Sequence, residues 1–146
     1  MYTGFLHLHN FLRWLIVIAG FICVIMAFRG WSGKRKWTNL DNILGVTFAS
    51  LLDLQLVIGL VLYFFVSPVT KAAFNQFGAA MKDENLRFYA VEHILMMVIA
   101  IVVVHLGRNK LKKAGEDVAR HRISAIFHTI GLILILAAIP WNRPMF

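Results

Sequence analysis

Histidine side chains offer the most specific chemistry in this otherwise apolar chain. His9 and His93 each lie in a long hydrophobic run, and Arg13 follows His9 by one helical turn. Two neutral imidazoles on facing helices suit the axial positions of a haem iron, because helices hold the ring nitrogens rigidly while the flat macrocycle fills the gap. We therefore predict one haem b ligated by His9 and His93, with Arg13 pairing a propionate and Glu92 as an outer hydrogen-bond acceptor. The plainer interpretation of each histidine is a hydrogen-bonded or solvated residue.

Further polar residues fall within the hydrophobic runs, where a charge at mid-bilayer costs about 2.5–3.5 kcal/mol on insertion scales. Asp53 and Gln55 stand near the middle of one run, and His128 lies about two turns inside another. Asp53 and Gln55 are consistent with a proton-accessible pair, a metal contact or a helix-packing hydrogen bond. His105 and His121 lie close to basic loops, so we expect both at the membrane interface.

The elements that must position these side chains are four apolar segments, each long enough to cross about 30 Å of hydrocarbon at about 1.5 Å per residue. Hydrophobic residues make up 60% of the 146 residues, more than a soluble core of this size can bury. Four continuously apolar segments are too few for a β-barrel. The sequence predicts an all-α integral membrane four-helix bundle, one domain with spans at about 9–28, 43–66, 88–106 and 123–141.

Basic residues are concentrated in two of the three loops between these predicted spans. Residues 29–36 hold four lysines and arginines, and residues 107–122 hold six. The positive-inside rule places both loops in the cytoplasm and both chain termini on the outer, periplasmic side. The predicted location is therefore the bacterial inner membrane, crossed several times.

Local signals support the helix boundaries. Thr38 through Asp41 is typical of a capping box that opens the second span, and Asp83 is suited to cap the third. The segment 71–81 is too short and too polar to cross a bilayer, but its two phenylalanines fall roughly on one helical face. We predict a short helix there, lying on the outer membrane surface.

Composition and motifs also narrow the function. The net charge of +8 comes from short loops beside membrane ends without interleaved aromatic residues, which favours lipid headgroups over nucleic acid as the partner. Cys23 is the single cysteine, so the sequence holds no disulfide framework, covalent haem attachment motif or cysteine metal knuckle. The sequence also lacks a phosphate loop and a dinucleotide fingerprint, and no enzyme activity is predicted.

Four stretches of the sequence together resemble a known family. They are MYTGFLHLHNFLRW at the start, LQLVIGLVLYFF in the second span, RFYAVEHILMM in the third and AAIPW near the end. They are similar to a small bacterial family, familiar from Bacteroidetes and usually labelled cytochrome B, over nearly the whole chain. The chain departs from the family at Asp53, where members often have histidine, and this puts a site involving the second span in doubt. The resemblance implies a four-helix b-type cytochrome and matches the family pattern at His9, Arg13, Gln55, Glu92, His93 and His121.

These observations predict a membrane cytochrome-like protein that transfers electrons through one bis-histidine haem b near the outer face. Its expected partners are the lipid bilayer and a quinone or the subunits of a larger respiratory complex. Two other functions stay open. One is a non-catalytic membrane subunit of a respiratory or transport complex, which needs no cofactor. The other is a proton or metal-ion path through residues whose depths step across the bilayer: Asp53, Glu92, His93 and His128.

Overall fold

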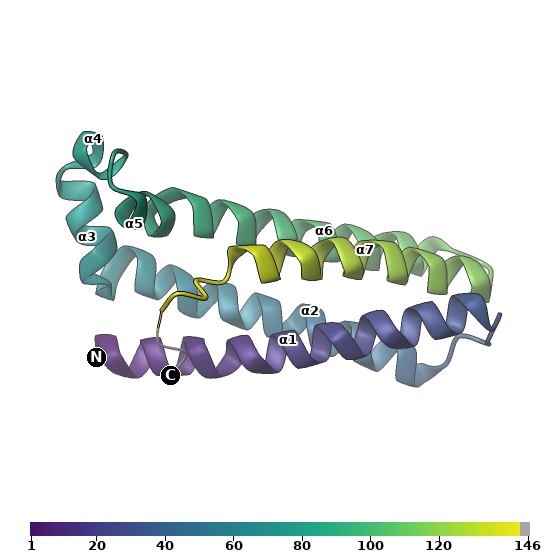
Figure 1. Cartoon of the computed structure of the whole chain (residues 1–146). Coiled ribbons are helices and arrows are strands. Elements are labelled where there is room, and N and C mark those ends of the chain that lie inside the picture. The colour runs from purple at the N-terminus through teal and green to yellow at the C-terminus, as the bar shows by residue number, and fades with distance from the viewer. Residues whose placement is uncertain (144–146) are drawn as a thin grey trace.

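The computed structural model describes residues 1–143 and shows four long helices side by side, with a small helical cap at one end (Figure 1). The long helices are α1 (Tyr2–Ser32), α2 (Asn39–Val61), α6 (His93–Lys113) and α7 (Asp117–Ala138). With the helical residues that adjoin α2 and α6, all four are long and apolar enough to cross a membrane. The described chain is all-helical, and the predicted multi-pass bundle is confirmed at this level.

The helices extend beyond most of the predicted spans. The four candidate spans are Tyr2–Ser32, Asn39–Val66, Glu84–Lys113 and Asp117–Ala138. Hydropathy marks only the part of a helix that suits hydrocarbon, whereas the backbone hydrogen bonds continue into the more polar turns at each end. The last helix ends earlier than the predicted residue 141, because Pro140 disfavours helical geometry in the preceding Ile139, which is extended (φ −72°, ψ 130°).

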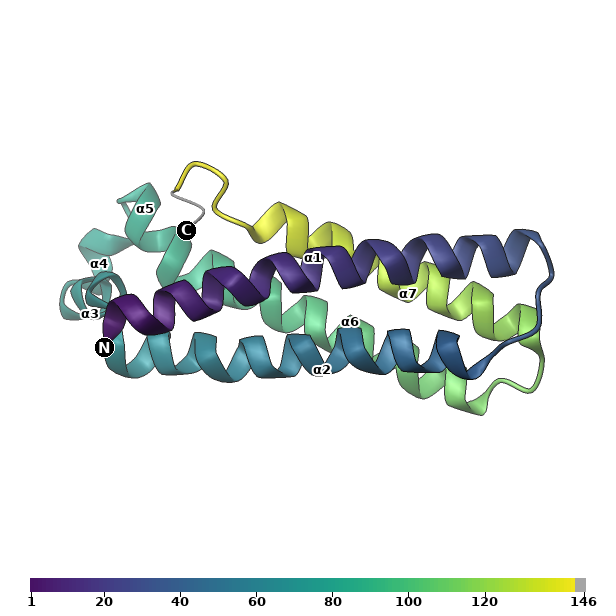
Figure 2. The same ribbon diagram turned by 90° about the horizontal axis from the view of Figure 1, so that it is seen from below.

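The bundle is closed on three sides and loosely packed on the fourth. Helix α1 packs against α2 and α7, and α7 packs against α6, whereas α2 and α6 touch each other much less (Figure 2). The centre of the core is aliphatic and aromatic, with Ile16, Phe48, Val104 and Ile135 almost fully buried. The connections at residues 33–38 and 114–116 share one end of the bundle, which we call the basic end.

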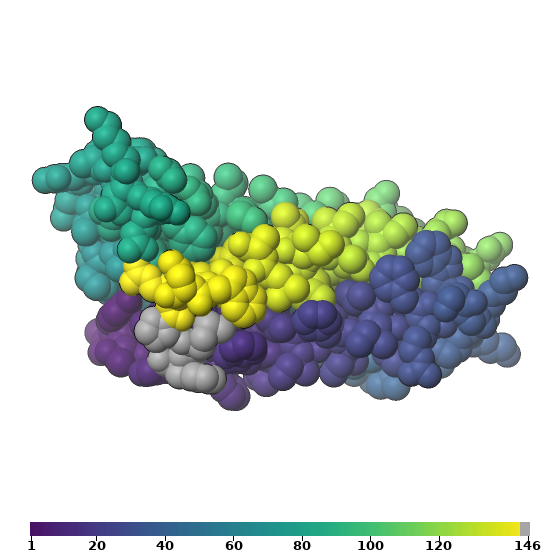
Figure 3. Space-filling view, in the orientation of Figure 1, coloured from purple at the N-terminus to yellow at the C-terminus, as the bar shows by residue number. Residues whose placement is uncertain are grey.

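The opposite end, here the cap end, carries three short helices: α3 (Pro68–Asn75), α4 (Phe77–Ala80) and α5 (Glu84–Arg87). The sequence predicts one helix over 71–81, but the chain turns at Gln76 (φ −137°, ψ 66°) and two helices form instead. Three buried alanines, Ala73, Ala80 and Ala90, pack together and hold the cap on the start of α6. The cap projects sideways from the bundle (Figure 3).

Two π-helical turns join the cap to the bundle. The first, η1 (Leu62–Val66), continues α2, and the second, η2 (Phe88–Glu92), leads from α5 into α6. The Tyr63 hydroxyl in η1 donates a hydrogen bond of 2.6 Å to the carbonyl oxygen of Ala90 in η2. Wide turns of this kind are frequent at functional sites, and both of these border the cavity described below.

The predicted helix caps are present. Thr38 and Asp41 form a reciprocal capping box at the start of α2, and Asp83 accepts a 2.9 Å hydrogen bond from the Leu86 amide. Arg35 donates two hydrogen bonds to the Asp41 carboxylate, at 2.6 and 3.1 Å. These hydrogen bonds raise the pKa of the Arg35 guanidinium above its usual value. The basic end is therefore held by a local network as well as by helix packing.

Candidate functional site

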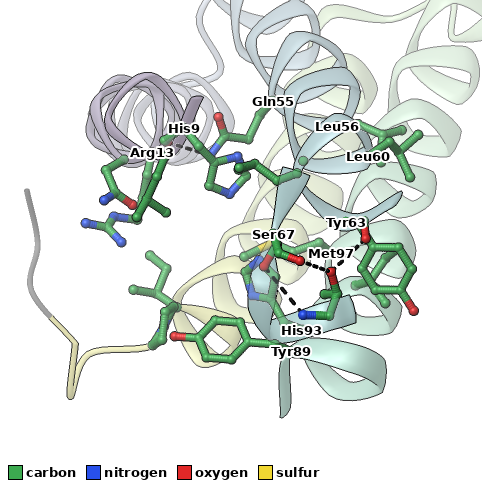
Figure 4. A pocket seen from close by; sticks show the side chains of 18 of the residues that line it. His9, Arg13, Gln55, Leu56, Leu60, Tyr63, Ser67, Tyr89, His93 and Met97 are labelled. Carbon is green, nitrogen blue, oxygen red and sulfur yellow. Dashed lines mark hydrogen bonds between the residues drawn. The ribbon is translucent and has the colours of Figure 1, made fainter. Parts of the chain in front are cut away.

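A cavity of about 420 Å³ lies in the half of the bundle near the cap (Figure 4). Small-molecule and cofactor sites commonly enclose about 300–1,000 Å³. Its walls come from all four long helices, the two π-turns, the start of α3 and the residues that follow α7. Four of the residues predicted to bind a cofactor line it: His9, Arg13, Gln55 and His93.

The two predicted ligands face this cavity from different helices. The imidazole rings of His9 on α1 and His93 on α6 have centroids 6.4 Å apart, with an angle of 66° between their planes. The Nδ1–H of His93 donates a 2.8 Å hydrogen bond to the carbonyl oxygen of Ala138, at the end of α7. This hydrogen bond fixes the tautomer of His93 and leaves its Nε2 free to bind a ligand.

The position of His9 depends on two residues of α2. Gly59 lies directly against the His9 ring, where an added Cβ would come 3.3 Å from Cε1. Gln55 donates a 2.9 Å hydrogen bond from its amide nitrogen to the main-chain oxygen of His9. Gly59 therefore leaves room for the ring, and Gln55 holds this turn of α1 against α2 (Figure 4).

Two arginines bring positive charge to the cavity. Arg13 is 8% exposed and lies one turn from His9 on α1. Arg143, from the segment after α7, stacks over the Tyr89 ring at 5.4 Å and donates a hydrogen bond to Asn85. Arg13 also lies over the Trp14 ring, with its guanidinium carbon 5.6 Å from the ring centroid. The two arginines therefore give the cavity a positively charged part of its lining.

The residues present fit a haem b. His9 and His93, whose ring centroids are 6.4 Å apart, would each supply one imidazole nitrogen to the haem iron. Within residues 1–143, His9 Nδ1 and Gln55 Oε1 are buried without a hydrogen-bond partner. The arginines complement two propionates, and the remaining walls are largely aliphatic and aromatic.

Two other predicted site residues lie away from this cavity. Glu92 pairs with Arg87 at 2.7 Å and is not among the residues that line the cavity. The acceptor that holds His93 is the main-chain oxygen of Ala138. Asp53 pairs with His105 at 2.7 Å on the outside of the bundle. Within the described part of the chain, no three histidine, cysteine, aspartate or glutamate side chains gather into a metal site.

Two histidines toward the basic end are buried inside the bundle. His121, expected at the membrane interface, lies four residues from the start of α7 and is 0% exposed. Its ring occupies the space beside Gly30, where a Cβ would come within 2.2 Å of Nδ1, and it packs against Trp37 with ring centroids 5.0 Å apart. His128 is also buried and shares a 2.9 Å hydrogen bond with Ser124. Both therefore pack inside α7 near the basic end.

Three residues that matter at the cavity were not predicted. Gly59 and Tyr63 lie in the same run of α2 and η1, and their roles follow from close contacts that an apolar pattern does not record. Arg143 reaches the cavity only because α7 ends early and the chain turns back (Figure 1). A basic residue just beyond a predicted span was the one available signal.

The fold and the site define a multi-pass helical membrane protein with a histidine-lined cavity between its helices. Comparisons of the chain with protein-family models, with curated proteins and with solved structures gave no match. The functional argument therefore rests on the residues and geometry of the cavity.

Proposed function

We propose that this protein is a membrane b-type cytochrome that holds one haem b between His9 and His93. The observation that carries the proposal is the 6.4 Å separation of the two imidazole rings across a cavity. The hydrogen bond from His93 Nδ1 to Ala138 adds the outer contact that metal-binding histidines usually have. When bound, the haem supplies a one-electron couple, and the activity is electron transfer.

Each residue around the cavity has a distinct part in this proposal. His9 and His93 supply one ring nitrogen each, while Gln55 and the Ala138 carbonyl keep these histidines in place. The cationic side chains of Arg13 and Arg143 neutralise the carboxylates of the cofactor. The aliphatic and methionine side chains between them exclude water, which helps to set the reduction potential. Those side chains include Leu52, Leu56, Ile94 and Met97.

The proposal includes a location and an orientation. We assign the cap end to the periplasmic side of a bacterial inner membrane, because the loops at the opposite end carry most of the basic residues. The haem then lies near the outer face, where it exchanges electrons with a quinone in the lipid or with a respiratory complex. The resemblance to the cytochrome B family at His9, Arg13, Gln55 and His93 supports the same function.

The test is a reduced-minus-oxidised absorption spectrum of the full-length protein, purified in detergent after expression with added haem precursor. We expect a sharp b-type band that is lost or converted to a high-spin spectrum in His9→Ala and His93→Ala. The matched control is His7→Ala, since His7 is an exposed histidine on the same helix two residues from His9. That variant keeps the full band.

Two results would contradict the assignment. A well-folded wild-type protein that stays colourless with haem supplied would favour a membrane subunit without a cofactor. A band that survives both His9→Ala and His93→Ala, with haem bound in equal amount, would rule out these two ligands.

A further inference from the structure

An acidic and a basic side chain form a pair on the lipid-facing side of the bundle. Asp53 Oδ1 on α2 and His105 Nε2 on α6 are 2.7 Å apart, and the two side chains are 53% and 45% exposed. Asp53 is 14 residues from the start of α2, which places it about 21 Å along the helix and far from either end. His105 is eight residues, about 12 Å, from the end of α6. The pair therefore faces outward between mid-depth and the basic end, deeper than the interfacial position expected for His105, where polar side chains ordinarily turn inward.

Within residues 1–143, the outward faces of the other long helices carry no comparable polar pair. Between Leu8 and Phe28, every exposed residue of α1 is leucine, isoleucine or phenylalanine. The exposed residues of α7 beyond Arg122 are isoleucines and an alanine. Apart from His105 itself, the outward residues of α6 from Leu95 to Leu106 are also aliphatic. Contact with lipid is enough to explain the apolar composition of these faces.

The exposed face of α2 has a different composition. Its exposed residues form one stripe along the helix from 43 to 57, here called the seam. Small and hydrogen-bonding residues occupy the middle of this seam, as they do where membrane helices pack closely. The seam consists of Ile43, Val46, Thr47, Ser50, Asp53, Leu54 and Val57.

We propose that the α2 seam is the interface between two copies of this chain in the membrane, with the Asp53–His105 pairs at its centre. Copies inserted in the same direction are related by a two-fold axis along the membrane normal, so each seam residue meets its counterpart at the same depth. The two carboxylates and two imidazoles then come together at one level. They alternate, and each carboxylate gains a second basic neighbour.

A second copy suits this face because the face is complementary to itself. It carries one acceptor and one donor at the same depth, and the hydrogen bond within a copy uses one carboxylate oxygen and one ring nitrogen. The other oxygen and the other ring nitrogen are available across the axis. The weak packing between α2 and α6 leaves this side of the bundle open to a neighbour. The interface does not depend on what the cavity binds.

Cysteine cross-linking in a bilayer tests the contact. The full-length protein carries Cys23→Ala to remove its single cysteine, and Ser50→Cys places a thiol in the middle of the seam. The matched control is Ile130→Cys, an exposed position on α7 at a similar depth. In dilute liposomes of phosphatidylethanolamine and phosphatidylglycerol, a membrane-permeable oxidant should give a covalent dimer severalfold more readily at position 50. Equal cross-linking at both positions, or none at position 50, would overturn the proposal.

Counting of photobleaching steps in the same liposomes tests the role of the Asp53–His105 pair. We expect the wild-type chain to be dimeric and the double variant Asp53→Leu, His105→Leu to be mainly monomeric. The control is Arg87→Leu, Glu92→Leu, which removes another half-exposed pair that lies at the cap end, away from the seam. A wild-type monomer, or a double variant that stays fully dimeric, would contradict the proposal.

Discussion

His93 on α6 donates a 2.8 Å hydrogen bond from Nδ1 to the main-chain oxygen of Ala138, the last helical residue of α7. The last carbonyls of a helix lack the amide partners they have inside it. Helix α7 ends here because Pro140 follows, and His93 satisfies the carbonyl that this ending leaves open. The same feature therefore closes α7, joins two helices and orients one of the proposed haem ligands.

Gly59→Ala should weaken cofactor binding without weakening the fold. The added Cβ would lie 3.3 Å from His9 Cε1, so the ring must move by a few tenths of an ångström. Alanine is also favoured over glycine in a helix by about 1 kcal/mol, which offsets the crowding in the fold as a whole. We expect a lower haem content at unchanged or slightly higher thermal stability, measured by absorption and by thermal denaturation.

The matched control for this substitution is Gly78→Ala, because Gly78 has no atom within 4 Å of an added Cβ. Haem content should be the same in that variant and in the wild type. If Gly59→Ala keeps the full haem content and an unaltered spectrum, His9 does not need its present position to bind the cofactor.

Gly30→Ala is expected to destabilise the protein strongly. Its Cβ would come within 2.2 Å of the His121 ring, which is fully buried, and overpacking of this kind typically costs about 1–3 kcal/mol. Stability can be followed with a thiol-reactive dye, because Cys23 is the single cysteine and is 5% exposed until the protein unfolds. Gly4→Ala on the same helix, with open space around it, should leave the unfolding temperature unchanged.

The double variant Gly30→Ala, His121→Ala separates crowding from other effects. Removal of the ring leaves room for the new methyl group. The double variant should therefore lose less stability than the two single variants lose in sum. Additive losses would show that the contact between residue 30 and the ring is not the cause.

The sequence was sufficient to bring His9 and His93 together. Helices α1 and α6 both run from the cap end toward the basic end, so depth follows from counting residues, and both histidines lie a short distance from the cap end. Gln55 does not follow from the same count, because counting places it near the middle of its span, and its hydrogen bond to the main-chain oxygen of His9 is seen only in the structure. The capping box at Thr38 was also predictable, because it depends on residues only three positions apart.

The sequence does not show whether the remaining polar side chains point into the bundle or outward, and the reasons are physical. In a membrane the core and the lipid are both apolar, so hydrophobic periodicity does not tell which side of α2 turns inward. Asp53 therefore gave no sign that it faces outward toward His105. The burial of His121 depends on Gly30, a residue far away in the sequence. The π-turns also rotate the residues that follow them, which changes the relation between Glu92 and the cavity.

Thr38→Ala should destabilise the basic end without affecting the cavity. The Thr38 hydroxyl accepts a hydrogen bond from the Asp41 amide, and loss of such a cap costs about 0.5–2 kcal/mol. The same change removes the hydroxyl that donates to the Asp41 carboxylate at 2.8 Å. We expect a lower unfolding temperature by the Cys23 assay and an unchanged haem spectrum. A changed spectrum would mean that the two ends of the bundle are coupled.

Arg13→Gln should remove the ability of the site to recognise the carboxylates of its cofactor. Arg13 is buried to 8% exposure and lines the cavity one turn from His9, and hydrogen bonds to charged groups contribute roughly 1.5–3 kcal/mol. The wild-type apoprotein should therefore bind haem at least about tenfold more tightly than haem dimethyl ester, which lacks the charges. The glutamine variant should bind the two compounds with similar affinity, measured by titration of the apoprotein in detergent.

The control for this experiment is Arg29→Gln, because Arg29 is an exposed arginine at the other end of α1. That variant should prefer haem over the ester as strongly as the wild type does. If Arg13→Gln also keeps the full preference, the carboxylates are recognised elsewhere, and Arg143 becomes the residue to replace next, since it is the second arginine that lines the cavity within residues 1–143.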